Sequence, residues 1–235
     1  MHMVRRALRA HIIPFVALSL AALAPSARAQ FNPPPAGTQV HDPAALKPPA
    51  GARVAIVEFE DMECPDCSVA NPLLKEASEK YHIPWVRHDF PLSFHAWSFQ
   101  AAVNARWFDQ KGGKKLGDEY RDAIFANQRS FGDDPSRMDA FTQQFASDHH
   151  IAFPFNVDPQ GKLTAEVKAD YALGQRIGIE HTPTIWVVTD HSKGAPFVEV
   201  VDRTKLFQLI DQALEDTKNA APAAPHHPAK HTSGK

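Results

Sequence analysis

A short apolar run that passes directly into a helical stripe is the feature that most constrains this chain. Residues 52–60, ARVAIVEFE, form a β-branched run suited to a buried strand. From residue 64 the apolar positions change to the spacing of one helix face: Val69, Ala70, Leu73, Leu74, Ala77 and Tyr81. The sequence predicts a strand followed by a helix, with Cys64 and Cys67 in its first turn and Pro72 as an internal kink.

The remaining apolar patterns alternate in the same way. Short apolar runs predict three more strands, at 83–92, 182–190 and 196–202. Helical stripes separate or follow them: three helices from about 95 to 150, one closed by Gly178, and one carrying Leu206–Leu214. This order predicts an α/β fold in which a mixed sheet has helices on both faces.

The first residues have the organisation of a secretory signal peptide. Three arginines precede an apolar run, Ile12–Ala24, and a small-residue pattern follows at Ala27–Arg28–Ala29. We expect cleavage near Ala29–Gln30, which removes residues 1–29 and makes the protein periplasmic or otherwise exported. The alternative is an uncleaved membrane anchor, but the apolar run falls short of the roughly 20 residues that a bilayer crossing needs.

Two segments outside the predicted domain lack periodicity. Residues 30–50 are proline-rich and predict a linker, and residues 218–235 predict a disordered tail. The folded domain is expected over 51–217, with no further apolar stretch long enough to span a membrane. Three histidines of the tail offer a loose metal site as the alternative interpretation: His226, His227 and His231.

Charge argues against one class of partner. Without the four arginines of residues 1–29, the chain has 21 basic and 27 acidic residues, a formal charge of −6. Nucleic acid requires a basic face, so we expect no nucleic-acid partner.

The chain contains two cysteines, Cys64 and Cys67. A disulfide between them closes almost no loop, so stabilisation is a poor reason for the pair and reactivity a better one. Zinc is the rival, because two thiolates at this spacing form half of a four-ligand site. The sequence has no second cysteine pair, and no histidine pair with His-X3-His spacing stands in the predicted folded part. We therefore expect redox chemistry and neither a bound metal nor a cofactor.

The helix start distinguishes the two sulfurs. The first faces unpaired backbone N–H groups and the positive end of the helix dipole, which favours a thiolate. The second lies deeper and can attack a mixed disulfide on the first. We expect Cys64 to be the exposed nucleophile and Cys67 the resolving thiol.

Several of these motifs together resemble the DsbA-like branch of the thioredoxin superfamily. They are the strand VAIVEF, the turn ECPDC with its kinked helix, and GIEHTPTIWV, within residues 52–216. Glu58 matches the buried acid of the first core strand, and Pro72 matches the kink proline. The resemblance implies a thioredoxin fold with a helical subdomain inserted at about 93–160.

The same resemblance implies a site. Thr182–Pro183 would be a cis peptide facing the cysteines and would expose the backbone of Thr182 to an extended substrate. Glu58 would have a raised pKa and exchange a proton with Cys67. The alternatives are an ordinary strand-start proline, and a surface acid at position 58 with Val57 and Phe59 turned inward. The implied partners are unfolded or thiol-bearing exported proteins and a quinone-linked membrane protein.

The residues between the cysteines bear on the direction of exchange. Pro65 and Asp66 differ from the Pro-His turn of strongly oxidising DsbA proteins. Asp66 and the nearby acids should oppose a thiolate on Cys64, by an amount comparable with the helix-terminus effect. His181 or His95 would offset this if either lay near the sulfurs, although the default interpretation of both is an ordinary surface histidine. A raised thiol pKa weakens an oxidant, so we expect an oxidase weaker than the DsbA type.

Other functions stay open at this point. A reductase or an isomerase would use the same two cysteines, although residues 30–50 are too short for the dimerisation domain of isomerases in this superfamily. An extracytoplasmic copper metallochaperone would use Cys64, Cys67 and a histidine, because copper(I) prefers soft ligands. A thioredoxin-fold binding module would use neither cysteine chemically.

Overall fold

The computed structural model describes residues 37–190 and 196–218. The predicted signal peptide, the first part of the predicted linker, nearly all of the predicted tail and residues 191–195 lie outside the described residues. Within these ranges the structure contains a four-stranded sheet in the order β2-β1-β3-β4. β1 pairs in parallel with β2, while β3 is antiparallel to both β1 and β4. The strand bounds are β1 Val54–Glu60, β2 Trp85–Asp89, β3 Thr184–Thr189 and β4 Phe197–Glu199.

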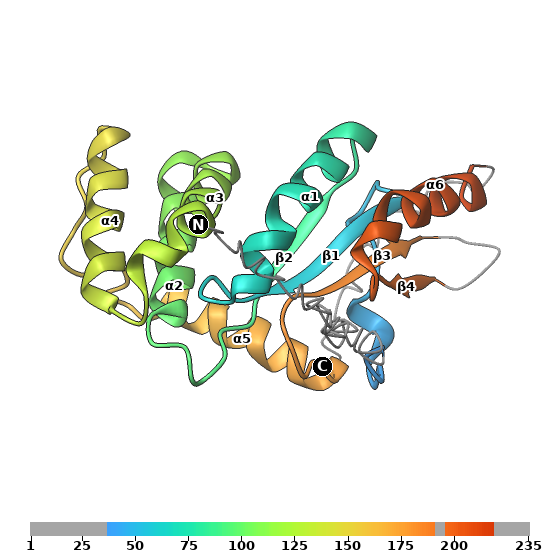
Figure 1. Ribbon diagram of the computed structural model, residues 1–235, viewed down its shortest axis with the longest axis horizontal. Helices are drawn as coiled ribbons and strands as arrows, with labels where there is room; N and C mark the ends of the chain where they lie inside the picture. Colours follow the sequence, from blue (N-terminus) through green and yellow to red (C-terminus); the bar gives the residue numbers. More distant parts are fainter. Residues whose placement is uncertain (1–36, 191–195, 219–235) are drawn as a thin grey trace, which may run out of the picture. The chain divides into compact units, whose positions relative to one another are not determined.

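Helices cover both faces of this sheet, as predicted (Figure 1). Those packed on the sheet are α1 Pro65–Tyr81, α5 Lys162–Ile177 and α6 Leu206–Asp216. Three others follow β2 as the predicted insertion: α2 Ser98–Gly112, α3 Lys114–Phe131 and α4 Pro135–Asp148. The described residues also contain two short 3₁₀ helices: η1 Pro43–Ala45 and η2 Arg203–Lys205. None of the helices described has both the length and the apolar composition that a membrane crossing needs.

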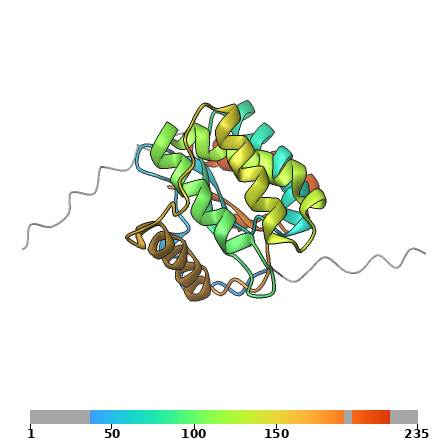
Figure 2. The same ribbon diagram turned by 90° about the vertical axis from the view of Figure 1, so that its left-hand side faces the viewer.

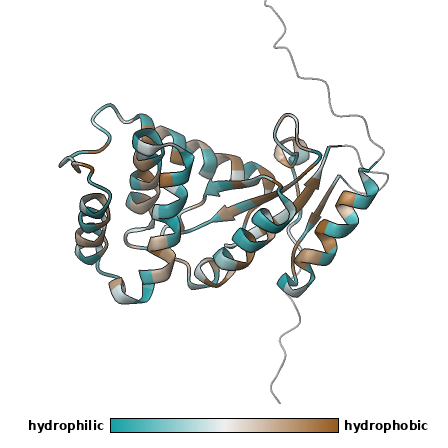
Figure 3. Ribbon diagram, turned by 90° about the horizontal axis from the view of Figure 1, so that it is seen from above, coloured by the Kyte–Doolittle hydropathy of each residue, from teal (hydrophilic) through white to brown (hydrophobic). Residues whose placement is uncertain are grey.

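The alternation of side chains along β1 divides the core in two. Val54 and Ile56 pack with residues of α1 and α6, whereas Ala55, Val57 and Phe59 pack with α5. Because the period of a strand is two, Glu58 projects to the α1 face, the face on which the cysteines lie. Both faces of β1 are therefore buried, and Figure 3 shows hydrophobic residues in brown along the central strands.

The inserted helices have a core of their own. Trp97, Trp107, Phe108 and Tyr120 are buried in one cluster, which also contains both cysteines. Figure 2 looks onto these helices, with α5 at the lower left, where it contacts α2. The helical insertion therefore supplies one wall of the environment around the cysteines.

The segment before β1 differs from the expected linker. The amide of His41 donates to the Ile177 carbonyl at 2.8 Å, and the Thr38 hydroxyl donates to the Glu199 carboxylate at 3.1 Å. Leu46, just after η1, is buried against the α5 side of the sheet. The described part, residues 37–50, thus packs on the domain, because Val40, Ala45 and Leu46 contact the hydrophobic cluster on the α5 side of the sheet.

Candidate dithiol site

α1 begins at the two cysteines. Cys64 is its N-cap, with extended backbone (φ −73°, ψ 121°), and Pro65 occupies the first helical position. Pro72 lies inside the same helix. Cys67 stands one turn along and is fully buried, while Cys64 retains 7% exposure. Cys64 is thus the more accessible sulfur, although far less open than we expected, and both cysteines are free thiols.

The chain segment before β3 closes over the first sulfur. The Thr182–Pro183 peptide bond is cis, as the resemblance implied. The Cys64 thiol donates a hydrogen bond of 3.3 Å to the Thr182 carbonyl oxygen. The Thr182 hydroxyl is buried and makes no hydrogen bond to any described residue. Thr182 and Pro183 therefore lie against the cysteines.

The two thiols have opposite acidities. The hydrogen bond from the Cys67 side chain is the largest contribution and outweighs burial. The Thr182 hydroxyl, which is free to donate to a thiolate, and the backbone N–H groups of Cys67 and Asp66 also act in this direction, and the pKa of Cys64 is lowered to about 6. Burial, followed by the interaction with Cys64, raises the pKa of Cys67 well above its usual value. At neutral pH Cys64 is a thiolate and Cys67 keeps its proton.

The expectation that neighbouring acids hold the pKa of Cys64 high is wrong, because those acids are occupied elsewhere. Glu60 binds two arginines. Asp61 accepts from the amides of Glu63 and Leu92, at 2.8 and 2.6 Å. Glu63 accepts from the amides at Trp97 and Ser98, which begin α2, at 2.7 and 3.1 Å. These carboxylates hold the end of β1 and the loop that follows it in position through their hydrogen bonds and ion pairs. Because they have these partners, they do not destabilise the Cys64 thiolate.

Asp66 has a basic partner. Its side chain is mostly exposed, and its carboxylate lies 3.6 Å from Arg203 Nη2. Arg203 Nη1 also donates to the Asp66 carbonyl oxygen at 3.0 Å. Arg203 thus offsets the negative charge of Asp66, the residue that stands where the Pro-His turn has a histidine. The sequence offered no signal for this pairing, because 137 residues separate the two.

Glu58 is buried under α1, which excludes the surface alternative. Burial, and next the charge of Glu60, raise the pKa of Glu58 to about 8. Its carboxylate accepts a 3.0 Å hydrogen bond from the indole N–H of Trp85. The charge of Glu58 also contributes to the raised pKa of Cys67. The Glu58 carboxyl therefore keeps its proton to a higher pH than an exposed glutamate does, and it is electrostatically coupled to the second thiol.

The two candidate histidines occupy different places. His95 Nδ1 lies 2.7 Å from the Asp61 carboxylate. His181 lines a small cavity of about 200 Å³ together with Asp66, Thr182, Pro183 and Arg203. No interaction of either ring with a sulfur is present among the described residues, so neither offsets charge at Cys64 directly.

Sequence reasoning missed one contact to the cysteine turn. Gln128 of α3 donates from its side-chain amide to the carbonyls of Met62 and Cys64, at 2.9 and 3.0 Å. It is buried, and it ties the helical insertion to the start of α1. A polar residue among the apolar positions of a helix was the available signal, but its target depends on the tertiary fold.

A buried ionic network beside the site was missed as well. Arg121 of α3 bonds to Glu60 at 2.8 Å and to Asp89 at 2.6 Å, where β1 and β2 end. Arg87 bonds to Glu60 at 2.8 Å, and Arg106 bonds to Asp89 at 2.7 Å. All are part of one set of ion pairs between the sheet and the insertion. They hold α3, and with it Gln128, against the cysteine turn.

Within the described ranges, no group of three or more His, Cys, Asp or Glu side chains is arranged to hold a metal ion. The tail histidines lie outside the described residues.

Comparison with known families agrees with this geometry. A family model described as Thioredoxin matches residues 50–203, well over half of the chain. The chain belongs to this thioredoxin family. The match spans both cysteines, Pro72 and the Thr182–Pro183 bond. No curated protein sequence matches the chain significantly.

Solved structures with a similar fold share low identity with this thioredoxin-family chain. DsbA2 of Pseudomonas aeruginosa is 24% identical, with a TM-score of 0.53 over 72% of this chain and 93% of that chain. Oxidised BdbD of Bacillus subtilis is 19% identical, with a TM-score of 0.56 over 77% and 98%. The thiol-disulfide exchange protein alpha-DsbA2 of Wolbachia pipientis is 18% identical, with a TM-score of 0.56 over 71% and 84%. The DsbA-like thioredoxin fold predicted from the sequence is confirmed.

Proposed function

We propose that this protein is an exported thiol-disulfide oxidoreductase that acts as an oxidase, donating a Cys64–Cys67 disulfide to thiol-bearing proteins. The observation that carries this proposal is the difference in acidity between the two thiols. The pKa of Cys64 is lowered to about 6, whereas that of Cys67 is raised. A stabilised thiolate favours the dithiol form of the pair, so its disulfide gains electrons readily.

The exchange is written for two substrate thiols. A substrate thiolate attacks the Cys64 sulfur, the Cys64–Cys67 bond breaks, and Cys67 leaves and takes a proton. The second substrate thiolate then attacks the substrate sulfur of the mixed disulfide and expels Cys64 as a thiolate. The substrate gains one disulfide and loses two electrons, which reduce the cysteine pair. A redox partner of disulfide or quinone chemistry at a membrane must then reoxidise it.

The neighbouring residues have defined roles in this scheme. Thr182 places its carbonyl against Cys64, and its backbone accepts an extended substrate segment beside Pro183. Glu58, with a pKa of about 8, supplies or removes the proton of Cys67. Pro65 and Asp66 tune the acidity of Cys64 through the turn that they form, and His181 lines the adjoining cavity.

Export supports this role. Residues 1–29 have the signal-peptide pattern, and cleavage near Ala29–Gln30 would leave the domain in an oxidising compartment. Unfolded exported proteins are then the substrates. The alternatives that use the same cysteines are a reductase or isomerase and a copper carrier; the close approach of Thr182 to Cys64 favours peptide exchange over copper binding, because it crowds the thiolate with a carbonyl oxygen.

Mixed-disulfide trapping tests the proposal. The oxidised protein is mixed with a reduced, unfolded protein that bears two thiols, and disulfide formation in that protein is followed. We expect catalysis by the native chain and none by Cys64→Ser. When reduced Cys67→Ser is mixed with the disulfide form of the same substrate, the Cys64 thiolate should attack that disulfide, release one substrate thiol and accumulate as a mixed disulfide. A Cys64→Ser variant that retained full activity would exclude thiol exchange and favour a binding module.

A further inference from the structure

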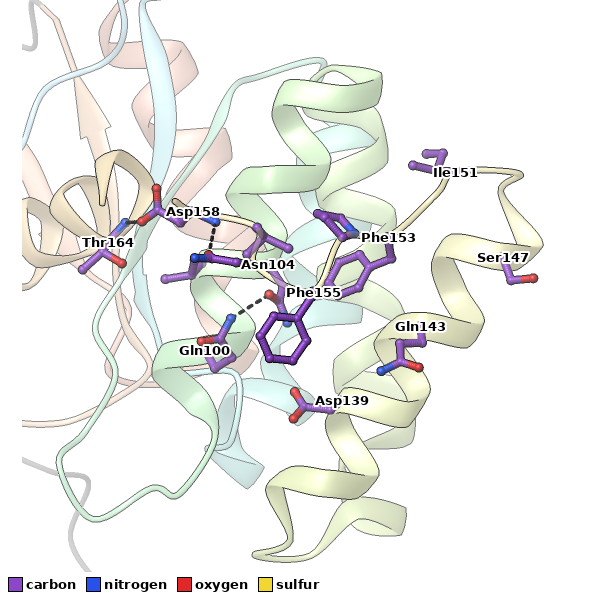
Figure 4. Close-up of a pocket in the computed structure, with 14 residues that line it drawn as sticks. Gln100, Asn104, Asp139, Gln143, Ser147, Ile151, Phe153, Phe155, Asp158 and Thr164 are labelled. Carbon is purple, nitrogen blue, oxygen red and sulfur yellow. Dashed lines mark hydrogen bonds between the residues drawn. The ribbon is translucent and has the colours of Figure 1, made fainter. Parts of the chain in front are cut away.

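A second candidate site lies in the helical insertion and uses none of the residues of the dithiol site. It is a cavity of about 860 Å³ between α2, α4 and the connection from α4 to α5 (Figure 4). Ligand pockets in proteins commonly have volumes of about 300–1,000 Å³. The cavity is therefore large enough for several side chains of a ligand and too large for a single ion.

The charged side chains that line the cavity are all acidic. The residues that line the cavity include two carboxylates, Asp139 and Asp158, and no lysine or arginine. Asp158 is already engaged, because it accepts hydrogen bonds from the amides of Leu163 and Thr164 at 3.1 and 2.8 Å. Asp139 has no hydrogen bond or ion pair with any described residue, and partial burial raises its pKa. One carboxylate thus faces the cavity without a cation.

Amide groups add acceptors beside this carboxylate. The Gln100 side chain donates to the Asn104 side-chain oxygen at 2.9 Å, which leaves the Gln100 carbonyl oxygen available. Gln143, one turn beyond Asp139 on α4, also lines the cavity. A group with several N–H donors would satisfy these acceptors together.

Two aromatic rings, Phe153 and Phe155, belong to the apolar part of the lining, together with Val103, Ile151, Pro154 and Val157. Phe153 is fixed against Trp107 and Phe108, with ring centroids 5.0 and 5.9 Å apart. Phe155, two residues on, is fully exposed. Figure 4 shows its ring among the residues that line the cavity, on the side of Gln100 and Asp139. An exposed ring at a cavity offers a face for stacking with a cation or for apolar contact.

We propose that this cavity binds an arginine side chain and its apolar neighbours within an extended segment of a partner protein. Arginine fits better than lysine, because a planar guanidinium has five donors for the carboxylate and amides and stacks on an aromatic face. The cavity has room for more than one side chain, and the exposed ring of Phe155 offers an apolar contact to the residue next to the arginine. The site binds without a covalent step, and the cysteines take no part in it.

Blocked peptides test this directly. The probe is acetyl-Leu-Arg-Leu-amide, and its matched control replaces arginine by citrulline, which keeps the shape and removes the charge. Binding to the full chain is measured by calorimetry at low ionic strength. We expect the arginine peptide to bind about fivefold more tightly than the citrulline peptide. Neither peptide contains a thiol, so the same affinities are expected in Cys64→Ser, whether or not the oxidoreductase proposal holds.

Two variants locate the site, and a third serves as control. Asp139→Asn should abolish the preference for arginine over citrulline. Asp148→Asn, on the same helix but outside the cavity and bonded to Gln144, should keep it. Phe155→Ala should weaken both peptides by a similar factor, because it removes the shared apolar face.

Three results of the peptide titrations would overturn the proposal. They are equal affinity for the two peptides, a preference that survives in Asp139→Asn, and no binding of either peptide at millimolar concentration. Concentration-dependent dimerisation that Phe155→Ala abolishes would also overturn it, because a second copy of the chain would then be the occupant.

Discussion

The Cys64 sulfur and the Thr182 carbonyl oxygen are 3.3 Å apart, although 118 residues separate them in the sequence. The carbonyl oxygen accepts a hydrogen bond from the neutral thiol. The hydroxyl of the same threonine is buried without a hydrogen bond and is positioned to donate once Cys64 ionises. One residue thus serves both protonation states of the nucleophile, which links the acidity of Cys64 to the position of β3.

Replacing Thr182 by valine should raise the pKa of Cys64 above about 6, because the thiolate loses a donor while the side-chain shape is kept. Thiolate absorbance at 240 nm, followed against pH, measures this value. Thr189→Val is the matched control, since Thr189 is buried at the far end of β3. A Cys64 titration that is the same in Thr182→Val and the native chain would show that the hydroxyl does not bind the thiolate.

Cys67→Ala should raise the pKa of Cys64 further than Thr182→Val does, because the hydrogen bond from Cys67 is the largest stabilising contribution to the thiolate. The rate of alkylation by iodoacetamide reports the thiolate directly. In the native chain this rate should rise with a midpoint near pH 6, and in Cys67→Ala the midpoint should move upward. In Cys64→Ala no alkylation should appear below about pH 9, given the raised pKa of Cys67; rapid labelling there would contradict the assigned acidities.

Arg203→Gln should raise the pKa of Cys64, because the charge of Asp66 is then no longer offset. Asp66→Asn should lower it, and Asp66→His should make the disulfide more oxidising. In the double variant Asp66→Asn/Arg203→Gln, the effect of the arginine should largely vanish. The effects should also shrink at high salt, because the pair is exposed. Additive effects in the double variant would mean that Arg203 acts independently of Asp66.

Glu58→Gln should change the pH dependence of stability. The pKa of Glu58 is about 8 in the folded protein and about 4.5 when unfolded, so between these values the folded state binds more protons. This group therefore makes the free energy of unfolding fall as pH rises, by up to about 1.4 kcal/mol per pH unit. Glutamine does not titrate, so Glu58→Gln lacks this decrease. The free energy of unfolding of the variant, relative to that of the native chain and measured with urea, should therefore be higher at pH 8 than at pH 4.5. A difference that does not change with pH would contradict the raised pKa.

The same substitution should slow the chemistry. Glutamine cannot take the proton of Cys67, so a mixed disulfide on Cys64 should be resolved more slowly in Glu58→Gln while Cys64 alkylation stays close to native. Stopped-flow measurement of adduct decay checks this. Decay at the native rate would leave Glu58 with a structural role only.

Arg121→Met should destabilise the protein by about 3–5 kcal/mol, because it leaves the buried carboxylates of Glu60 and Asp89 without their shared partner. Lys75→Met removes an exposed ion pair with Asp122 and should cost less than about 1 kcal/mol. Urea unfolding measures both. Similar costs for the two variants would show that burial of the Arg121 network does not determine its contribution.

The sequence predicted the elements that depend on local pattern. The apolar run of β1, the helical stripe of α1 and Gly178 at the end of α5 each correspond to an observed element. Cys64 and Cys67 were recognisable because their spacing and the helix start are local as well. The cis bond at Thr182–Pro183 came from the family resemblance, because local pattern alone also fits a strand-start proline.

The electrostatics of the site were beyond local pattern. Asp66 and the nearby acids predicted an opposed thiolate, but Arg87 and Arg121 compensate Glu60, and Arg203 compensates Asp66. Backbone amides bind the carboxylates of Asp61 and Glu63. The 37–50 segment was misread for a related reason: proline content predicted a linker, whereas a single buried leucine, Leu46, helps to hold it on the domain. Charge pairing and docking of this kind depend on tertiary distances that spacing in the sequence does not determine.

The reduction potential of the Cys64–Cys67 pair, measured against glutathione by thiol trapping at equilibrium, tests the central claim most directly. A Cys64 thiolate with a pKa near 6 stabilises the dithiol form, so we predict a potential well above that of the glutathione pool, as an oxidase requires. A potential as low as that of thioredoxin would contradict the proposed direction of exchange, and the protein would then act as a reductase or isomerase supplied with electrons.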